Sequence, residues 1–178
     1  MPPRVRIIGI DPGLSISGFA VIDSNSNTVK LVECGLIKTR TKDSTADRLN
    51  QIHTAVSKLI DKHKPSALAV EDNFYGKNFK TAKLMSQAEA MILLAGAETN
   101  LTIRKFPTKT VKQAVVGRGD ASKSQVSFMV GRHLRLKTDS VPRDISDALA
   151  VALCCMFKSN STRRGVSVFD SISGRVAG

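Results

Sequence analysis

The sequence has no tryptophan, one tyrosine and three cysteines, and aromatic residues make up only 4% of its 178 positions. Three cysteines, two of them the neighbours Cys154 and Cys155, do not suit a small disulfide-stabilised domain and favour a reduced, cytoplasmic protein. The longest apolar stretch, residues 148–157, is much shorter than the roughly 20 residues of a membrane-spanning helix. The N-terminus also lacks the apolar stretch of a signal peptide, so we expect no association with a membrane.

Acidic residues are scarce relative to basic ones. The chain has 15 Asp and Glu against 27 Lys and Arg, which gives a formal net charge of +12. A charge of this sign and size favours a polyanionic partner, above all nucleic acid. With 42% hydrophobic residues, the composition is that of an ordinary globular domain, which excludes disorder along the whole chain.

Apolar periodicity and turn residues predict an α/β fold in which three strands precede an alternation of helices and strands. The predicted strands cover residues 4–10, 18–22, 28–37, 66–70 and 101–106. The predicted helices cover a segment from Ser44 or Thr45 to just before Pro65, and then residues 79–98, 108–116, 122–134 and 142–157. Tight links make the first three strands an antiparallel meander, whereas helical crossovers bring the later strands parallel to the first. We expect one domain, residues 1–158, followed by a flexible tail rich in Ser, Gly and Arg, residues 159–178.

Four acidic residues interrupt or border core-forming segments. Asp11 follows the first predicted strand, Glu71 follows the fourth, and Asp144 and Asp147 share one face of the last helix. Each has an ordinary structural interpretation: a turn cap for Asp11, a solvated strand end for Glu71, and acids at a helix N-terminus for the other two. Their apolar flanks favour a functional role, because burying an acid carries a desolvation cost that a structural role does not explain. Asp72 cannot share a site with Glu71, since side chains alternate along a strand.

Parallel strands that end at one edge of a sheet would bring Asp11 and Glu71 together. Several carboxylates at one site either acquire raised pKa values or are neutralised by a cation. Oxygen ligands select Mg²⁺ or Mn²⁺, and two such ions about 3.5–4 Å apart can activate water and stabilise the leaving oxygen of a phosphodiester. No His and Cys residues have the spacing of a zinc site.

Four motifs resemble, in order and spacing, those of the RuvC family of Holliday-junction resolvases. They are Ile8-Gly-Ile-Asp-Pro-Gly-Leu-Ser with the following Gly18-Phe-Ala-Val-Ile, and the segments 70–78, 111–125 and 144–150. The resemblance covers about residues 5–157. It implies a ribonuclease-H-like fold, with a five-stranded mixed sheet flanked by helices, and a homodimer with one active site per subunit. It also implies paired, symmetric nicks in a four-way DNA junction that leave 5′-phosphate and 3′-hydroxyl ends, and the branch-migration proteins RuvA and RuvB as partners.

The same resemblance assigns roles to particular residues. Asp11, Glu71, Asp144 and Asp147 would be the catalytic, metal-binding carboxylates, with two Mg²⁺ ions expected per site and Mn²⁺ able to substitute. Some members of the family carry histidine at the position of Asp144. The remaining assignments concern the substrate: Lys112 and Lys123 match basic residues near the DNA backbone, and Phe74 matches an aromatic residue presented to the junction crossover.

Basic residues are concentrated ahead of the last predicted helix. Ten Lys and Arg lie between Arg104 and Arg143, and only two Asp oppose them. A run of charge is often just a solvated surface, but this concentration favours a track for phosphates. Within it, Arg118 lies in a Gly-Arg-Gly loop that leads into a helix N-terminus, a setting that suits phosphate. Lys77, near the start of the long helix, is a further candidate for contact with DNA.

The sequence therefore favours a divalent-metal-dependent endonuclease that resolves Holliday junctions in DNA recombination and repair. Three alternatives stay open. The chain could be another nuclease of the same fold that acts on RNA–DNA hybrid or precursor RNA, or a junction-binding module without catalysis. The segment Gly9-Ile-Asp-Pro-Gly also resembles the phosphate loop of actin-like ATPases, although those proteins need two such lobes.

Overall fold

The computed structural model describes residues 4–25, 28–72, 79–137 and 141–164. Its strands are β1 (Val5–Asp11), β2 (Ile16–Ser24), β3 (Val29–Lys38), β4 (Ala67–Asp72) and β5 (Thr102–Pro107). Its helices are α1 (Thr45–His63), α2 (Phe79–Glu98), α3 (Thr108–Val116), α4 (Lys123–Leu134) and α5 (Arg143–Arg164). The predicted α/β order of elements is confirmed. None of these helices is both long and apolar enough to cross a membrane within the described residues.

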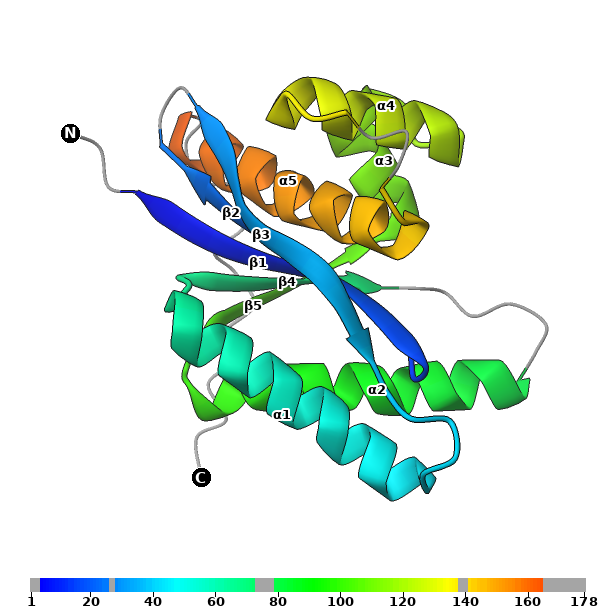
Figure 1. Ribbon diagram of the computed structural model, residues 1–178. Helices are drawn as coiled ribbons and strands as arrows, with labels where there is room; N and C mark the ends of the chain where they lie inside the picture. Colours follow the sequence, from blue (N-terminus) through cyan, green and yellow to red (C-terminus); the bar gives the residue numbers. More distant parts are fainter. Residues whose placement is uncertain (1–3, 26–27, 73–78, 138–140, 165–178) are drawn as a thin grey trace, which may run out of the picture.

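The five strands form one mixed sheet in the order β3-β2-β1-β4-β5 (Figure 1). β2 pairs antiparallel with both β1 and β3, whereas β4 runs parallel to β1 and β5 runs parallel to β4. The predicted meander and crossovers are therefore both present. Helices α1 and α2 cover one face of the sheet, and α5 covers the other, with α3 and α4 beyond it (Figure 1).

Alternation along the central strands divides the core between the two faces. Ile8 and Ile10 of β1 pack in the cluster beneath α1 and α2, whereas Ile7 packs in the cluster around α5. In β4, Leu68 and Val70 face the first cluster and Ala69 faces the second. Because side chains alternate with a period of two, residues 11 and 71 must emerge on the face that carries α5.

Helix α5 lies unusually close to the sheet because two glycines remove the side chains between them. A Cβ atom on Gly9 would lie 2.4 Å from the carbonyl oxygen of Ala148 and 2.8 Å from the Cβ of Ala152. A Cβ atom on Gly18 would lie 1.9 Å from the carbonyl oxygen of Asp144. Both contacts are far inside van der Waals range, so only glycine allows α5 to begin directly against β1 and β2.

The last helix is longer than the sequence suggested. We expected it to end at Phe157 and a flexible tail to begin at Ser159, but α5 continues to Arg164. The Ser159 hydroxyl donates a hydrogen bond to the carbonyl of Cys155 one turn earlier (2.8 Å) and accepts one from Arg104 of β5 (2.8 Å). These bonds tie the helix to the edge of the sheet, so the start of the expected tail was wrong by six residues. The rest of that tail lies outside the described residues.

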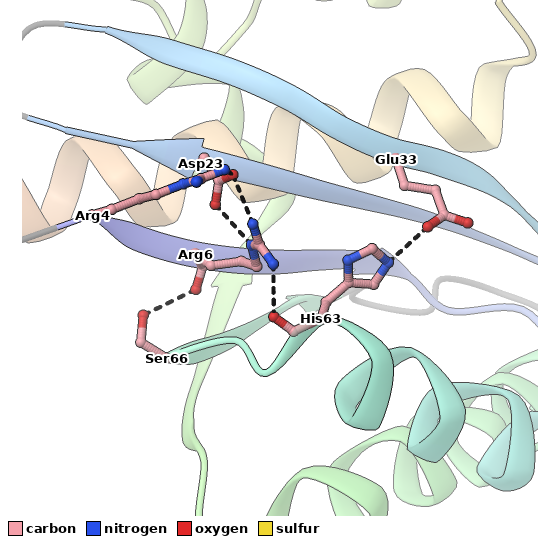
Figure 2. A network of polar contacts seen from close by, with 6 residues as sticks. All are labelled: Arg4, Arg6, Asp23, Glu33, His63 and Ser66. Atoms are coloured by element: carbon pink, nitrogen blue, oxygen red, sulfur yellow. Dashed lines mark hydrogen bonds and ion pairs between the residues drawn. The ribbon is translucent and has the colours of Figure 1, made fainter.

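A polar network closes the opposite end of the sheet (Figure 2). The Arg6 guanidinium donates to both carboxylate oxygens of Asp23 on β2 (2.8 and 3.0 Å) and to the carbonyl of His63 at the end of α1 (3.0 Å). Although burial opposes it, hydrogen bonds from Arg6 and Arg4 hold the pKa of Asp23 below its ordinary value. The imidazole of His63 in turn lies 2.7 Å from Glu33 of β3. Strands β1 to β3 and α1 are thus fixed at the end remote from Asp11.

Substituting Gly9 by Ala tests the close approach of α5. The added methyl group meets helix backbone that cannot move aside, so we expect a loss of about 3 kcal/mol in the free energy of unfolding, measured by urea denaturation. The matched control is Gly117→Ala, where the methyl group enters open space and only the positive φ of 91° is unfavourable, at a cost of about 1 kcal/mol. Equal losses in the two variants would contradict the role of Gly9.

Candidate active site

The carboxyl ends of β1 and β4 place two acids side by side. Ile10 of β1 is in register with Val70 of β4, so Asp11 and Glu71 follow at the same level of two parallel neighbours. Both emerge on the face covered by α5, as the alternation requires. Their carboxyl groups lie close enough to raise the pKa of Asp11. The Glu71 residue is only 7% exposed, so this pair is largely withdrawn from water.

Two further acids come from the first turns of α5. Because Gly18 pairs with Asp11 across the β1–β2 ladder, the contact between Gly18 and the backbone of Asp144 brings the start of the helix over Asp11. Asp147 lies three residues further along the helix, on the same face. All four predicted acids line a single cavity of about 460 Å³. The other polar side chains that line it are Thr108, Lys112, Lys123 and Arg143.

The electrostatics of the cavity are those of crowded negative charge. Burial, followed by repulsion from Glu71 and Asp147, the hydrogen bond with Glu71 and repulsion from Asp144, raises the pKa of Asp11 to about 8. The basic side chains that line the cavity therefore do not fully offset the negative charge of the four carboxylates.

Two polar contacts satisfy some of the carboxylate oxygens in the cavity. The Lys123 ammonium lies 3.0 Å from a carboxylate oxygen of Asp147, and the Thr108 hydroxyl donates to Glu71 (2.8 Å). Sequence reasoning missed Thr108 and Arg143. Thr108 directly follows β5, the next parallel strand, so its position at the same edge of the sheet was a usable signal. Arg143 belongs to the basic segment and precedes Asp144, but nothing in the sequence indicated that it would line the cavity.

The donor set fits hard divalent cations better than any other group. Its ligands are carboxylate oxygens, and no His or Cys lines the cavity among the described residues. The side chains do not yet form a closed ligand cluster: no three Asp, Glu, His or Cys in the described part of the chain are grouped tightly enough to hold an ion. The Lys123–Asp147 ion pair contributes to this, because it occupies a carboxylate oxygen that a cation would otherwise use.

The structure places the other residues singled out in the sequence in different surroundings. Lys112 and Lys123 line the cavity, whereas Arg118 does not and instead pairs with Asp120 through two hydrogen bonds (2.8 and 3.1 Å). Asp72 faces away from Glu71, as alternation predicted, and lies 3.3 Å from Lys105 of β5. Phe74 and Lys77 lie outside the described residues.

Comparison with known proteins agrees with this geometry. Residues 7–155 match the family model described as crossover junction endodeoxyribonuclease RuvC. This chain belongs to the RuvC family. The RuvC of Halothermothrix orenii is 44% identical over 148 residues, which are 83% of this chain and 90% of that protein. Membership in this family of nucleases implies dependence on divalent metal ions.

Solved structures extend the likeness to three dimensions. Thermus thermophilus RuvC in complex with Holliday junction substrate superposes with a TM-score of 0.83 at 30% identity, over 88% of this chain and 96% of that one. The yeast mitochondrial Holliday junction resolvase Ydc2 has a TM-score of 0.66 at 15% identity, over 92% and 84% of the two chains, and so shares the fold. The predicted ribonuclease-H-like fold of the RuvC family is confirmed.

Replacing Asp11 by Asn should reduce the pH dependence of stability in the metal-free protein. The pKa of Asp11 in the folded state, about 8, lies above its ordinary value of 3.8, so the free energy of unfolding falls as the pH rises through this range. In EDTA at pH 9 the variant should exceed the wild type by at least about 1 kcal/mol, or about 2–4 °C in Tm. Thermal unfolding at pH 5 and pH 9 measures this, and parallel curves for the two proteins would contradict the repulsion among the carboxylates.

Proposed function

We propose that this chain resolves four-way DNA junctions by metal-dependent hydrolysis of two symmetrically placed phosphodiesters, leaving 5′-phosphate and 3′-hydroxyl ends. One observation carries the proposal: four acids from three separate elements, Asp11, Glu71, Asp144 and Asp147, line one cavity together with Lys112 and Lys123. The match to a relative solved with a Holliday junction supports the choice of substrate.

The proposed cofactor is Mg²⁺, two ions per site, with Mn²⁺ able to substitute. Asp11 and Glu71 would hold the ions from the sheet, and Asp144 and Asp147 would hold them from α5. When bound, such ions act as Lewis acids toward the phosphate and lower the pKa of a water nucleophile. Cation binding would offset the repulsion among the carboxylates that helps to raise the pKa of Asp11.

The basic side chains of the cavity would bind DNA rather than the metal ions. Lys112 is half-buried in the cavity wall, and Lys123 is exposed at its rim, where its ammonium pairs with Asp147. Both would bind the phosphates that flank the scissile bond, and Lys123 would exchange its carboxylate partner for DNA as the ions bind. Thr108 orients Glu71 through its hydrogen bond. Phe74 and Lys77 remain predicted contacts of the junction, as does Arg118, although its guanidinium is engaged by Asp120.

The proposal also includes a homodimer, whose two-fold symmetry would match that of the junction and couple the two nicks. Helix α2 is the proposed contact, since Leu94 is 45% exposed and Ala90 and Ala97 beside it on the helix are exposed too. RuvA and RuvB are the proposed partners. The nuclease domain, expected to end at residue 158, is proposed to extend to Arg164, the end of α5. The proposed location is the cytoplasm, which the three free cysteines support.

Junction cleavage with purified protein tests the proposed activity. We expect paired nicks in a synthetic mobile four-way junction with Mg²⁺, none in EDTA, and a loss of at least about 100-fold in the Asp11→Asn variant. Asp61→Asn, which removes an exposed acid of α1 remote from the cavity, is the control and should cleave normally. An RNA–DNA hybrid of the same length distinguishes the alternative nuclease, and junction binding without cleavage would point to a non-catalytic module.

Substituting Leu94 by Glu tests the dimer. A charge in the centre of an apolar contact between two α2 helices should yield monomers in light scattering, with single rather than paired nicks. Phe128→Glu is the matched control, since Phe128 is 62% exposed but belongs to α4, and its variant should remain dimeric. If the Leu94→Glu variant remains dimeric, α2 does not form the dimer contact.

A further inference from the structure

A second cavity lies on the face of the sheet opposite the acids, between β3 and α1. It has a volume of about 650 Å³ and shares no lining residue with the acidic cavity. Its apolar lining residues are Phe19, Leu36, Ile37, Ala55 and Leu59. Its polar lining residues are Lys38, Asn50, Gln51, Thr54, Lys58 and Lys62. We call this cavity the β3–α1 groove.

Two small residues, Gly35 and Ala55, shape the groove. Gly35 of β3 presents no side chain, and a Cβ atom there would lie 2.8 Å from the ring of Phe19, so the ring occupies that space and forms part of the lining. On the helix side, Ala55 is the short residue that faces the strand region. The groove is therefore apolar at its base.

The charge around the groove has one sign. Three lysines line it, and among the described residues no carboxylate does. Lys62 is neutralised by Glu33 at 2.7 Å, but neither Lys38 nor Lys58 forms an ion pair with any described residue. An occupant must therefore supply negative charge at the rim and apolar groups at the base.

The neighbouring strand adds a third type of contact. β3 is an edge strand, paired only with β2 in the described part of the sheet, and its last residues line the groove. Its outer edge offers backbone donors and acceptors to an added extended segment. Duplex DNA uses phosphates and has no apolar groups to fill the base, so a peptide fits this combination better.

From these three features we infer that the β3–α1 groove binds an acidic peptide segment of a partner protein, with apolar or aromatic anchors on Phe19, Ile37 and Leu59 and carboxylates toward Lys38 and Lys58. The chain's own residues 165–178 are a poorer match, because they contain one Asp and one Arg and so carry no net side-chain charge. Since the groove is separate from the acidic cavity, a partner bound there leaves that cavity open to DNA.

A phage-displayed library of random 12-residue peptides tests the inference. Selection on the wild-type protein, with counter-selection on Ala55→Trp, whose indole fills the groove, should enrich acidic sequences with two or more apolar anchors. Fluorescence polarisation with the enriched peptide should show a loss of affinity of about tenfold in Lys58→Glu. Lys42→Glu, the same charge change at an exposed turn outside the groove, should bind the peptide as the wild type does.

Other outcomes would overturn the inference. Enrichment of no peptide that distinguishes wild type from Ala55→Trp and Lys58→Glu would exclude a peptide site. Weaker junction binding in Lys58→Glu, with peptide binding unchanged, would assign the groove to DNA. A change from dimer to monomer in Ala55→Trp, measured by light scattering, would assign it to a second copy of the chain. Junction cleavage by Lys58→Glu is measured alongside, so a failure of the proposed nuclease activity is distinguished from a failure at the groove.

Discussion

Mutual repulsion of carboxylates at one edge of the sheet is the interaction on which the site depends. Asp11 and Glu71 are brought together by adjacent parallel strands, and α5 adds Asp144 and Asp147 because Gly9 and Gly18 let it lie against β1 and β2. The raised pKa of Asp11 reports the free-energy cost of this arrangement. The Lys123–Asp147 ion pair offsets only part of this cost, so the crowding is best understood as preparation for cations that remove the rest.

The same reasoning explains why the acids are distributed over three elements. Side chains of one strand alternate between faces, so Glu71 and Asp72 separate: the first enters the cavity, and the second meets Lys105 on the other face. A single segment therefore cannot supply several ligands from consecutive positions, and parallel strand ends with a crossing helix supply them instead. This also means that the ligand set exists only in the folded chain, and that stability and metal binding are linked.

Much of this arrangement could be predicted from the sequence. Apolar runs ending in Asp11 and Glu71, and the helical spacing of Asp144 and Asp147, were sufficient to group the acids, because strand ends and helix faces follow from local periodicity. Contacts that depend on tertiary register were not predictable in this way. The partner of Lys123 is Asp147, and Arg104 of a distant strand donates a hydrogen bond to Ser159 in α5. The composition of residues 159–164 predicted a tail, but these residues belong to α5, which the hydrogen bond between Arg104 and Ser159 ties to β5.

Asp72 shows how a residue outside the cavity still bears on its geometry. Lys105 lies between Asp72 of β4 and Glu89 of α2, at 3.3 and 2.5 Å, and its pKa is raised chiefly by the hydrogen bond with Glu89. Glu89 is 7% exposed, so the ion pair is shielded on the helix side and links α2 to β4 and β5. Because Met85 of the same helix lines the acidic cavity, a shift of α2 would alter the wall beside Glu71. The ion pairs of Lys105 on one face of the sheet thus help to fix the position of α2. That helix borders the acidic cavity on the other face.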